Sequence, residues 1–221
     1  MSASISQRVS HLRNPGDQPA NEVKPATWPP AHDSPISVSK NGRAISRFGD
    51  SIWDFSEWAG KPLVLNMGDG PQRKDRQRIS PQNANLLRKV AAWFLLGPRS
   101  VRTPTTLKAK FKLVRPIFTF CTTQGIAASE LVRYPALIEL LGAQLAPSRF
   151  GEVVSVLHML HEQREELGFS ILDRPGITRL SSCASKHQER QTPYIPPRIW
   201  TYVCCRRSKI DPLSRLMPIQ N

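Results

Sequence analysis

Basic side chains are the residues of this sequence whose types and spacing could do chemistry. Twelve lysines and arginines lie between residues 71 and 115, where Asp75 is the one acid, so this fifth of the chain has a net charge of +11 out of a total of +14. Ammonium and guanidinium groups at this density attract polyanions, and phosphate backbones in particular. We therefore expect a positioned footprint for nucleic acid, against the alternative of a basic linker followed by a solvated helix face.

The cations after residue 98 follow a helical spacing. At about 100° per residue, Lys108, Lys112 and Arg115 share one sector of a helix, while Lys110 lies on its other flank. No acid occurs between residues 101 and 126 to pair with them. A helix with cations along one sector could bind in a major groove, and the free N–H groups at its start could bind phosphate. The predicted contacts to double-stranded DNA are Arg73, Lys74, Arg76, Arg78, Arg99, Arg102, Thr105, Thr106, Lys108, Lys112 and Arg115.

Other kinds of site have weaker support in the sequence. His158 and His161 would lie on one helical face with Glu162 or Glu165, but no third and fourth metal ligand can be identified. The glycines at 68 and 70 lack the G-K-[ST] of a phosphate-binding loop. We expect no metal, no cofactor and no small-molecule substrate. The four cysteines lack C-x-x-C pairing and are predicted to be reduced thiols: Cys121, Cys183, Cys204 and Cys205.

The elements that must position these residues are predicted to be mainly helical. The fold class expected is a small helical bundle that follows a short β-hairpin region and a flexible, proline-rich N-terminal segment. The expected organisation is a flexible segment at 1–43, a short β segment at 44–70, a basic linker at 71–80, a helical DNA-binding domain at 81–175 and a C-terminal tail at 176–221.

Helix boundaries within the predicted bundle rest on capping residues. Ser80-Pro81 begins the first helix, which ends at Gly97, and Thr103-Pro104 begins the second, which runs to Gly125. A third helix is predicted within 129–145 and a fourth within 148–167, with Gly168 as its end. The second helix carries one apolar stripe at three- and four-residue spacing, formed by Leu107, Phe111, Val114, Phe118 and Cys121.

Three segments resemble one known family. Residues 102–107 (RTPTTL), followed by a helix that ends Phe118-Thr-Phe120, resemble the opening of the core-binding domain of tyrosine recombinases, the phage-type integrases. Residues 191–200 (QTPYIPPRIW) are similar to the junction that leads into the catalytic domain, and residues 46–54 (SRFGDSIWD) resemble a segment near the start of these integrases. The resemblance implies a SAM-like helical bundle that clamps duplex DNA, with further recombinase protomers as partners.

The resemblance stops where the family's catalytic residues would begin. Only 21 residues follow Trp200, so we expect DNA binding linked to integration and recombination, without strand cleavage, by a truncated product of a mobile element. His161 and Arg164 have the H-x-x-R spelling of the family's catalytic motif, but they precede the junction and are interpreted as a coincidence. The alternatives are a stand-alone transcriptional or accessory DNA-binding protein and a basic protein–protein interaction module.

The expected location of the protein is the cytoplasm. No apolar signal core follows Met1. No stretch approaches the roughly 18 consecutive apolar residues that a transmembrane helix requires. A membrane partner is therefore not expected.

Overall fold

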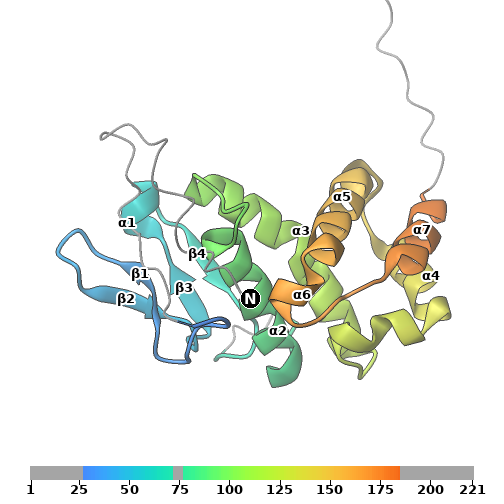
Figure 1. Cartoon of the computed structure of the whole chain (residues 1–221), viewed down its shortest axis with the longest axis horizontal. Helices are drawn as coiled ribbons and strands as arrows, with labels where there is room; N and C mark the ends of the chain where they lie inside the picture. Colours follow the sequence, from blue (N-terminus) through green and yellow to red (C-terminus); the bar gives the residue numbers. More distant parts are fainter. Residues whose placement is uncertain (1–26, 72–76, 185–221) are drawn as a thin grey trace, which may run out of the picture. The chain divides into compact units, whose positions relative to one another are not determined.

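The computed structural model describes residues 27–71 and 77–184, which belong to one compact unit of the chain. Most of these residues are helical, and four short strands precede the main helices (Figure 1). This confirms the predicted class of a mainly helical fold with a β-hairpin region ahead of it. The expected flexible segment falls largely on residues 1–26, and most of the expected C-terminal tail falls on 185–221; both ranges lie outside the described residues.

The β segment consists of two antiparallel pairs. Strand β1 (Pro35–Val38) pairs with β2 (Ala44–Arg47), and β3 (Ile52–Asp54) pairs with β4 (Val64–Asn66), with the short helix α1 (Ser56–Ala59) between β3 and β4. Trp53 lies opposite Leu65 and both are fully buried, whereas their strand neighbours Ile52 and Val64 face outward. This alternation is the two-residue period of a half-buried sheet.

Strand β1 corrects the prediction that residues 1–43 have no packed structure. Proline-rich composition concealed the strand, because proline weakens most strand patterns. Here Pro35 is the first residue of β1, where a missing N–H is tolerated, and Ile36 is buried with only 2% of its surface exposed. The β segment therefore begins at residue 35 and not at residue 44.

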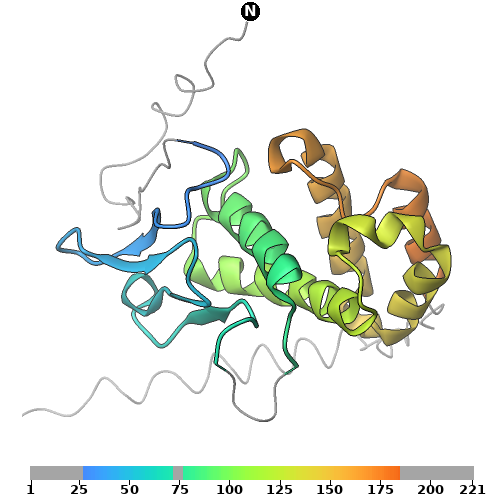
Figure 2. The same cartoon turned by 90° about the horizontal axis from the view of Figure 1, so that it is seen from below.

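The first two long helices begin where their caps predict. Helix α2 (Pro81–Leu96) starts after Ser80, whose side chain accepts a hydrogen bond from the Asn83 N–H. Helix α3 (Pro104–Thr123) starts after Thr103, whose side chain accepts from the Thr106 N–H. The two helices run side by side in both views (Figures 1 and 2) and make the largest helix–helix contact of the described residues.

The remaining helices are shorter than predicted and include one that the sequence did not reveal. The predicted fourth helix is divided at Gln163 into α5 (Phe150–Glu162) and α6 (Arg164–Leu167), and Gly168, at φ 78°, ends α6 as expected. Helix α7 (Arg174–Ser182) was not predicted, and it packs against α4 and α5 beyond the predicted domain boundary at residue 175. Two 3₁₀ helices, η2 (Ala128–Arg133) and η3 (Pro147–Arg149), flank α4 (Pro135–Gln144).

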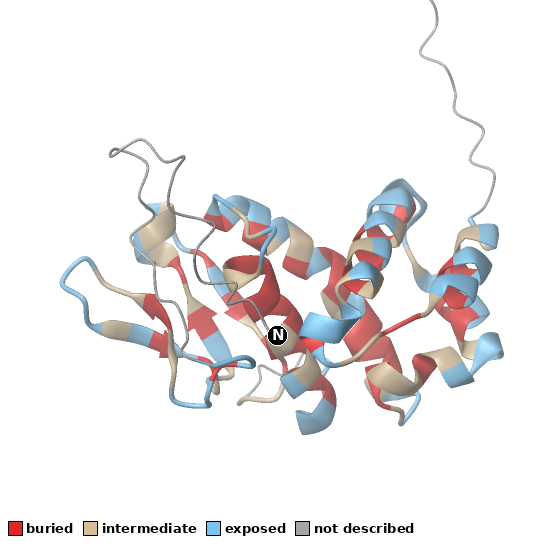
Figure 3. Ribbon diagram, in the orientation of Figure 1, coloured by how far each residue is buried: buried red, intermediate tan, exposed pale blue. Residues whose placement is uncertain are grey.

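One hydrophobic core joins the β segment to the helices. Buried hydrophobic residues form a single cluster that extends from Ile36 in β1 to Leu180 in α7. Figure 3 shows buried residues in red on both the strands and the helices. The buried Asn83 side chain adds three hydrogen bonds. Its amide nitrogen donates to the Thr122 hydroxyl and the Ile126 carbonyl, and its amide oxygen accepts from the Ala128 N–H. The start of α2 is consequently held to the C-terminal end of α3, and the β segment is part of the same folded body.

Candidate nucleic-acid interface

Two lysines lie together on the solvent side of α3. Lys112 is exposed and Lys108 is half-buried, and they are one helical turn apart beside the exposed Thr105. The predicted apolar stripe lies beside these lysines around α3, and every residue of that stripe is buried. We call Lys108 and Lys112 the lysine flank. It presents two cations on a helix whose position is fixed by its buried side.

The third cation predicted for this flank has a different role. Arg115 Nε donates a hydrogen bond to the main-chain carbonyl oxygen of Asn66 over 3.1 Å, so the half-buried guanidinium joins α3 to the end of β4. The prediction that Arg115 is a DNA contact stays a prediction, and the structure adds a contact within the fold. Spacing within one helix could not reveal this contact, because Asn66 lies 49 residues earlier in the chain.

Arg88 is a second basic residue that serves the interior. Its Nη2 pairs with Asp69 Oδ2 at 2.6 Å, its Nε donates to the Asp50 carbonyl oxygen, and only 5% of the residue is exposed. Asp50 and Asp69 both belong to the β segment, so the pair fastens that segment to α2. One of the twelve basic residues counted between residues 71 and 115 is therefore used inside the fold and does not add to the surface charge.

The cations near the start of α3 divide between two sides. Arg102 is exposed in the turn that precedes α3. Arg99, from the same turn, instead reaches Glu162 at the end of α5, with 3.5 Å between Nη1 and Oε2. Lys110 lies on that side too, with its Nζ 5.4 Å from the centre of the Phe94 ring. Sequence reasoning identified Arg99 but not its partner, because 63 residues separate the two and no local pattern links them.

The two threonines predicted as contacts are placed differently at the helix start. The Thr106 hydroxyl lies 2.8 Å from the Thr103 hydroxyl, which also accepts from the Thr106 N–H, so Thr106 belongs to the cap of α3. Thr105 is exposed on the same side as the lysine flank. Thr105 is thus the threonine whose side chain remains available at the surface of this first turn.

The predicted linker contacts lie at the other end of α3 or outside the described residues. Arg73, Lys74 and Arg76 belong to the undescribed residues 72–76. Arg78 is exposed and is two residues from Ser80, whose N–H donates to the Thr122 hydroxyl near the end of α3. Thr122 is about 25 Å from Thr105 along the helix axis, at 1.5 Å per residue. Arg78 and Arg102 therefore mark opposite ends of α3 and do not form one cluster.

The H-x-x-R residues make local contacts. His161 Nδ1 lies 3.4 Å from the Ser170 hydroxyl, and Arg164 donates to the His161 carbonyl oxygen while it pairs with Glu165 at 3.3 Å.

Within residues 27–71 and 77–184, no group of three or more His, Cys, Asp or Glu side chains could hold a metal ion. Among those same residues, no helix combines the length and apolar character needed to cross a membrane.

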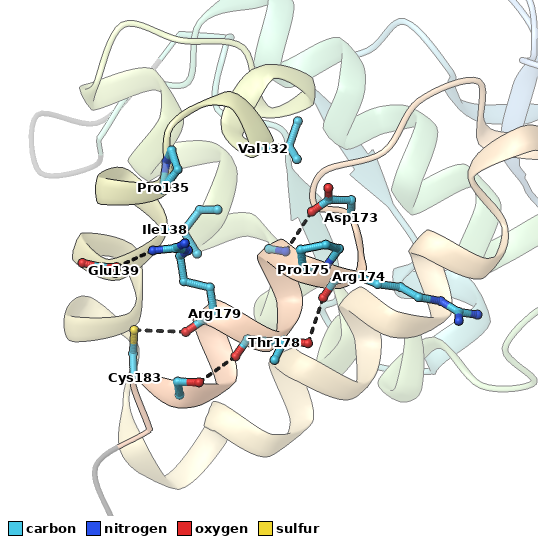
Figure 4. Close-up of a pocket in the computed structure, with 12 residues that line it drawn as sticks. Val132, Pro135, Ile138, Glu139, Asp173, Arg174, Pro175, Thr178, Arg179 and Cys183 are labelled. Carbon is cyan, nitrogen blue, oxygen red and sulfur yellow. Dashed lines mark hydrogen bonds and ion pairs between the residues drawn. The ribbon is translucent and has the colours of Figure 1, made fainter.

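A groove of about 970 Å³ lies between α4 and α7, where sequence analysis predicted no site (Figure 4). Val132 and Ile138 contribute apolar surface, and the Glu139–Arg179 ion pair, at 3.0 Å, crosses it. Asp173 is occupied as the cap of α7, since its Oδ1 accepts from the Gly176 N–H. The lining of the groove combines two carboxylates, Glu139 and Asp173, with two arginines, Arg174 and Arg179, so it is not a surface of cations alone.

The described residues thus place Lys108, Lys112, Thr105 and Arg102 at the surface around the first half of α3, and use Arg88 and Arg115 internally. Comparison of the chain with protein-family models, curated proteins and solved structures gives no match. The chemistry that this surface can perform is the binding of anionic groups, because it contains cations and hydroxyl groups and no acid of its own helix.

Proposed function

We propose that this chain binds duplex DNA through the solvent side of α3. The observation that carries the proposal is that α3 combines two neighbouring surface lysines with a complete absence of acids between residues 101 and 126. A surface helix that only needs solubility usually mixes both signs of charge, and pairs them at a spacing of three or four residues. A helix side that carries cations and no acids instead attracts a phosphate backbone.

The rigidity of α3 supports the same function. Asn83, Arg115 and the buried apolar stripe hold the helix against three other parts of the fold. A helix that is already positioned loses less entropy when it binds, and this favours its use as a recognition surface. Thr105 and Arg102, exposed at the start of α3, are the side chains that we assign to phosphate or base-edge contacts beside the lysine flank.

The resemblance to tyrosine recombinases supports a narrower version of this proposal. In that version the helices from α2 onward form a SAM-like core-binding domain of an integrase-like protein, and the DNA is a recombination site. Partner protomers bound to neighbouring half-sites would then complete the assembly. The activity proposed for the described residues is binding alone, and no strand-cleavage step is assigned to them.

The salt dependence of DNA binding tests the proposal. Affinity for a short duplex is measured by fluorescence anisotropy between about 50 and 200 mM salt, where each phosphate contact adds about 0.9 to the slope of log K against log salt. The double variant Lys108→Gln/Lys112→Gln should flatten the slope by up to about two contacts' worth. The control is Arg133→Gln/Arg149→Gln, which removes the same charge from two exposed residues on η2 and η3.

The two variants separate a local footprint from a general charge effect. If the lysine flank contacts DNA, the slope falls for the lysine variant and stays near the wild-type value for the arginine control. Equal slopes for both variants, or absence of duplex binding by the wild-type chain at the lowest salt, would overturn the proposal. A folded circular dichroism spectrum for each variant shows that the comparison concerns charge and not unfolding.

A further inference from the structure

A second group of charges lies on the flank of α3 opposite the lysine flank. It consists of Arg99, Lys110, Phe94 and Glu162, and we call it the Arg99 cluster. Arg99 Nη1 is 3.5 Å from Glu162 Oε2, with 61% and 54% of the two side chains exposed. Lys110 lies over the Phe94 ring at 5.4 Å. The cluster joins the turn after α2, the second turn of α3 and the last residue of α5.

The charges within the Arg99 cluster are not balanced. The cluster contains two cations and one carboxylate, which pairs with Arg99, and Phe94 offers Lys110 only the weak attraction of a ring face. The pKa of Lys110 is lowered, first by burial and then by repulsion from Arg99. The two cations are therefore close enough to repel each other while Glu162 is present. An additional anion at this position would relieve that repulsion.

The ion pair that closes the cluster is of a weak kind. Both side chains are more than half exposed, and the separation of 3.5 Å is long for a charge-assisted hydrogen bond. Exposed pairs of this type contribute little to stability, because water and salt screen them. A phosphate group offers an arginine two acceptor oxygens in the geometry of its guanidinium, which a single carboxylate oxygen at 3.5 Å does not. Arg99 can thus exchange Glu162 for a phosphate at small cost.

We infer that Arg99 and Lys110 form a second contact to the phosphate backbone of duplex DNA, and that Glu162 occupies this contact in the free protein. Lys110 is about 160° from Lys112 around the axis of α3. A helix in a major groove about 12 Å wide has one strand's phosphates on each side. The lysine flank would then contact one strand and the Arg99 cluster the other. This inference rests on the proposed binding of duplex DNA by α3.

A double-mutant cycle on the full chain tests the role of Glu162. Glu162→Gln frees Arg99 and should tighten duplex binding about two- to fivefold at low salt, the range that an exposed ion pair provides. Arg99→Gln should weaken binding and flatten the salt slope by about one contact. In the Arg99→Gln background, Glu162→Gln should have a smaller effect than in the wild type, because the cation that it releases is absent.

A matched control shows whether the gain belongs to the ion pair. Glu152→Gln removes the same charge from an exposed residue at the other end of α5, about 15 Å away along the helix. Glu162→Gln should exceed this control in its effect on affinity. Equal gains for the two variants, or a gain from Glu162→Gln that persists in full without Arg99, would overturn the inference.

The failure of this inference is distinguishable from failure of the proposed function. The Lys108→Gln/Lys112→Gln variant is measured in the same series. If it flattens the salt slope while the Arg99 and Glu162 variants behave as the control, DNA binds α3 by the lysine flank alone, and the Arg99 cluster is a structural contact. If no variant changes the slope, duplex binding by α3 is itself rejected.

Discussion

The Arg115 side chain donates its Nε hydrogen to the main-chain carbonyl oxygen of Asn66, so that the longest helix of the described residues is tied to the last strand of the β segment. Arg88 makes an equivalent connection from α2 to Asp69 and Asp50. Both arginines lie in the part of the sequence with the highest positive charge. Part of that charge therefore assembles the fold, while other cations of the described residues, such as Arg102 and Lys112, are exposed.

Replacement of Arg115 should reduce stability more than it reduces DNA affinity. Arg115→Gln removes the donor to the Asn66 carbonyl, and loss of a hydrogen bond to a charged group costs about 1.5–3 kcal/mol. Urea unfolding followed by circular dichroism measures this loss. Arg133→Gln, at an exposed position, should change the free energy of unfolding by less than about 0.5 kcal/mol. A similar small change for Arg115→Gln would contradict the structural role.

Removal of one partner of the Arg88–Asp69 pair should destabilise the protein much more than replacement of both partners by apolar residues. Only 6% and 14% of the two side chains are exposed. Asp69→Asn would leave the Arg88 charge buried without its counter-ion, at a cost of about 3–5 kcal/mol. Arg88→Met/Asp69→Leu should be more stable than Asp69→Asn, because it buries no unpaired charge. Thermal unfolding of the two variants checks the order, and the reverse order would show that the pair is not the basis of this contact.

Asn83 should tolerate no substitution that changes its donors and acceptor. Its side chain makes three hydrogen bonds, to Thr122, Ile126 and Ala128, and only 1% of the residue is exposed. Asn83→Leu leaves buried backbone groups unsatisfied, and each such group costs about 1–3 kcal/mol. Hydrogen exchange of the Ala128 amide reports directly on its hydrogen bond to Asn83 and should accelerate in this variant. Asn85→Leu, at an exposed position of the same helix, serves as the control.

Cys121 should be inert to thiol reagents in the folded chain. Burial raises the pKa of its thiol from 9.0 to about 12. At about pH 8.5 the reactive thiolate is therefore nearly absent. Peptide mass spectrometry after iodoacetamide treatment should find Cys121 unmodified in the native protein and modified in urea. Alkylation of Cys121 at the same rate in both conditions would contradict its burial.

The raised pKa of the Cys121 thiol also predicts how the free energy of unfolding changes with pH. Because the unfolded thiol ionises near 9.0 and the folded one near 12, the unfolded state binds fewer protons between these values. Stability contributed by this thiol is then complete below about pH 9 and falls as pH rises toward 12. Cys121→Val lacks this thiol, so its free energy of unfolding should decline less steeply with pH over that window.

Local signals in the sequence predicted the long helices well. Ser80-Pro81 and Thr103-Pro104 are capping pairs whose effect is confined to one turn, and both helices begin where these pairs predict. Gly168 ends α6 for the same local reason, since its φ of 78° suits glycine. Strand β1 escaped prediction because it lies in a proline-rich stretch, although its partner β2 is near in sequence. Helix α7 escaped prediction because it is short and packs on α4 and α5, earlier elements of the chain.

The sequence by itself determined where the charge is concentrated and which side of α3 is apolar, because both follow from residue order and the 3.6-residue period of a helix. Only the tertiary structure decided which cations gain a partner within the fold. Arg115 and Arg99 differ from Lys112 through the approach of Asn66 and Glu162, residues 49 and 63 positions away in the chain. The physical reason is that hydrogen bonds and ion pairs act over a few ångströms in space, and folding, not sequence spacing, sets those separations.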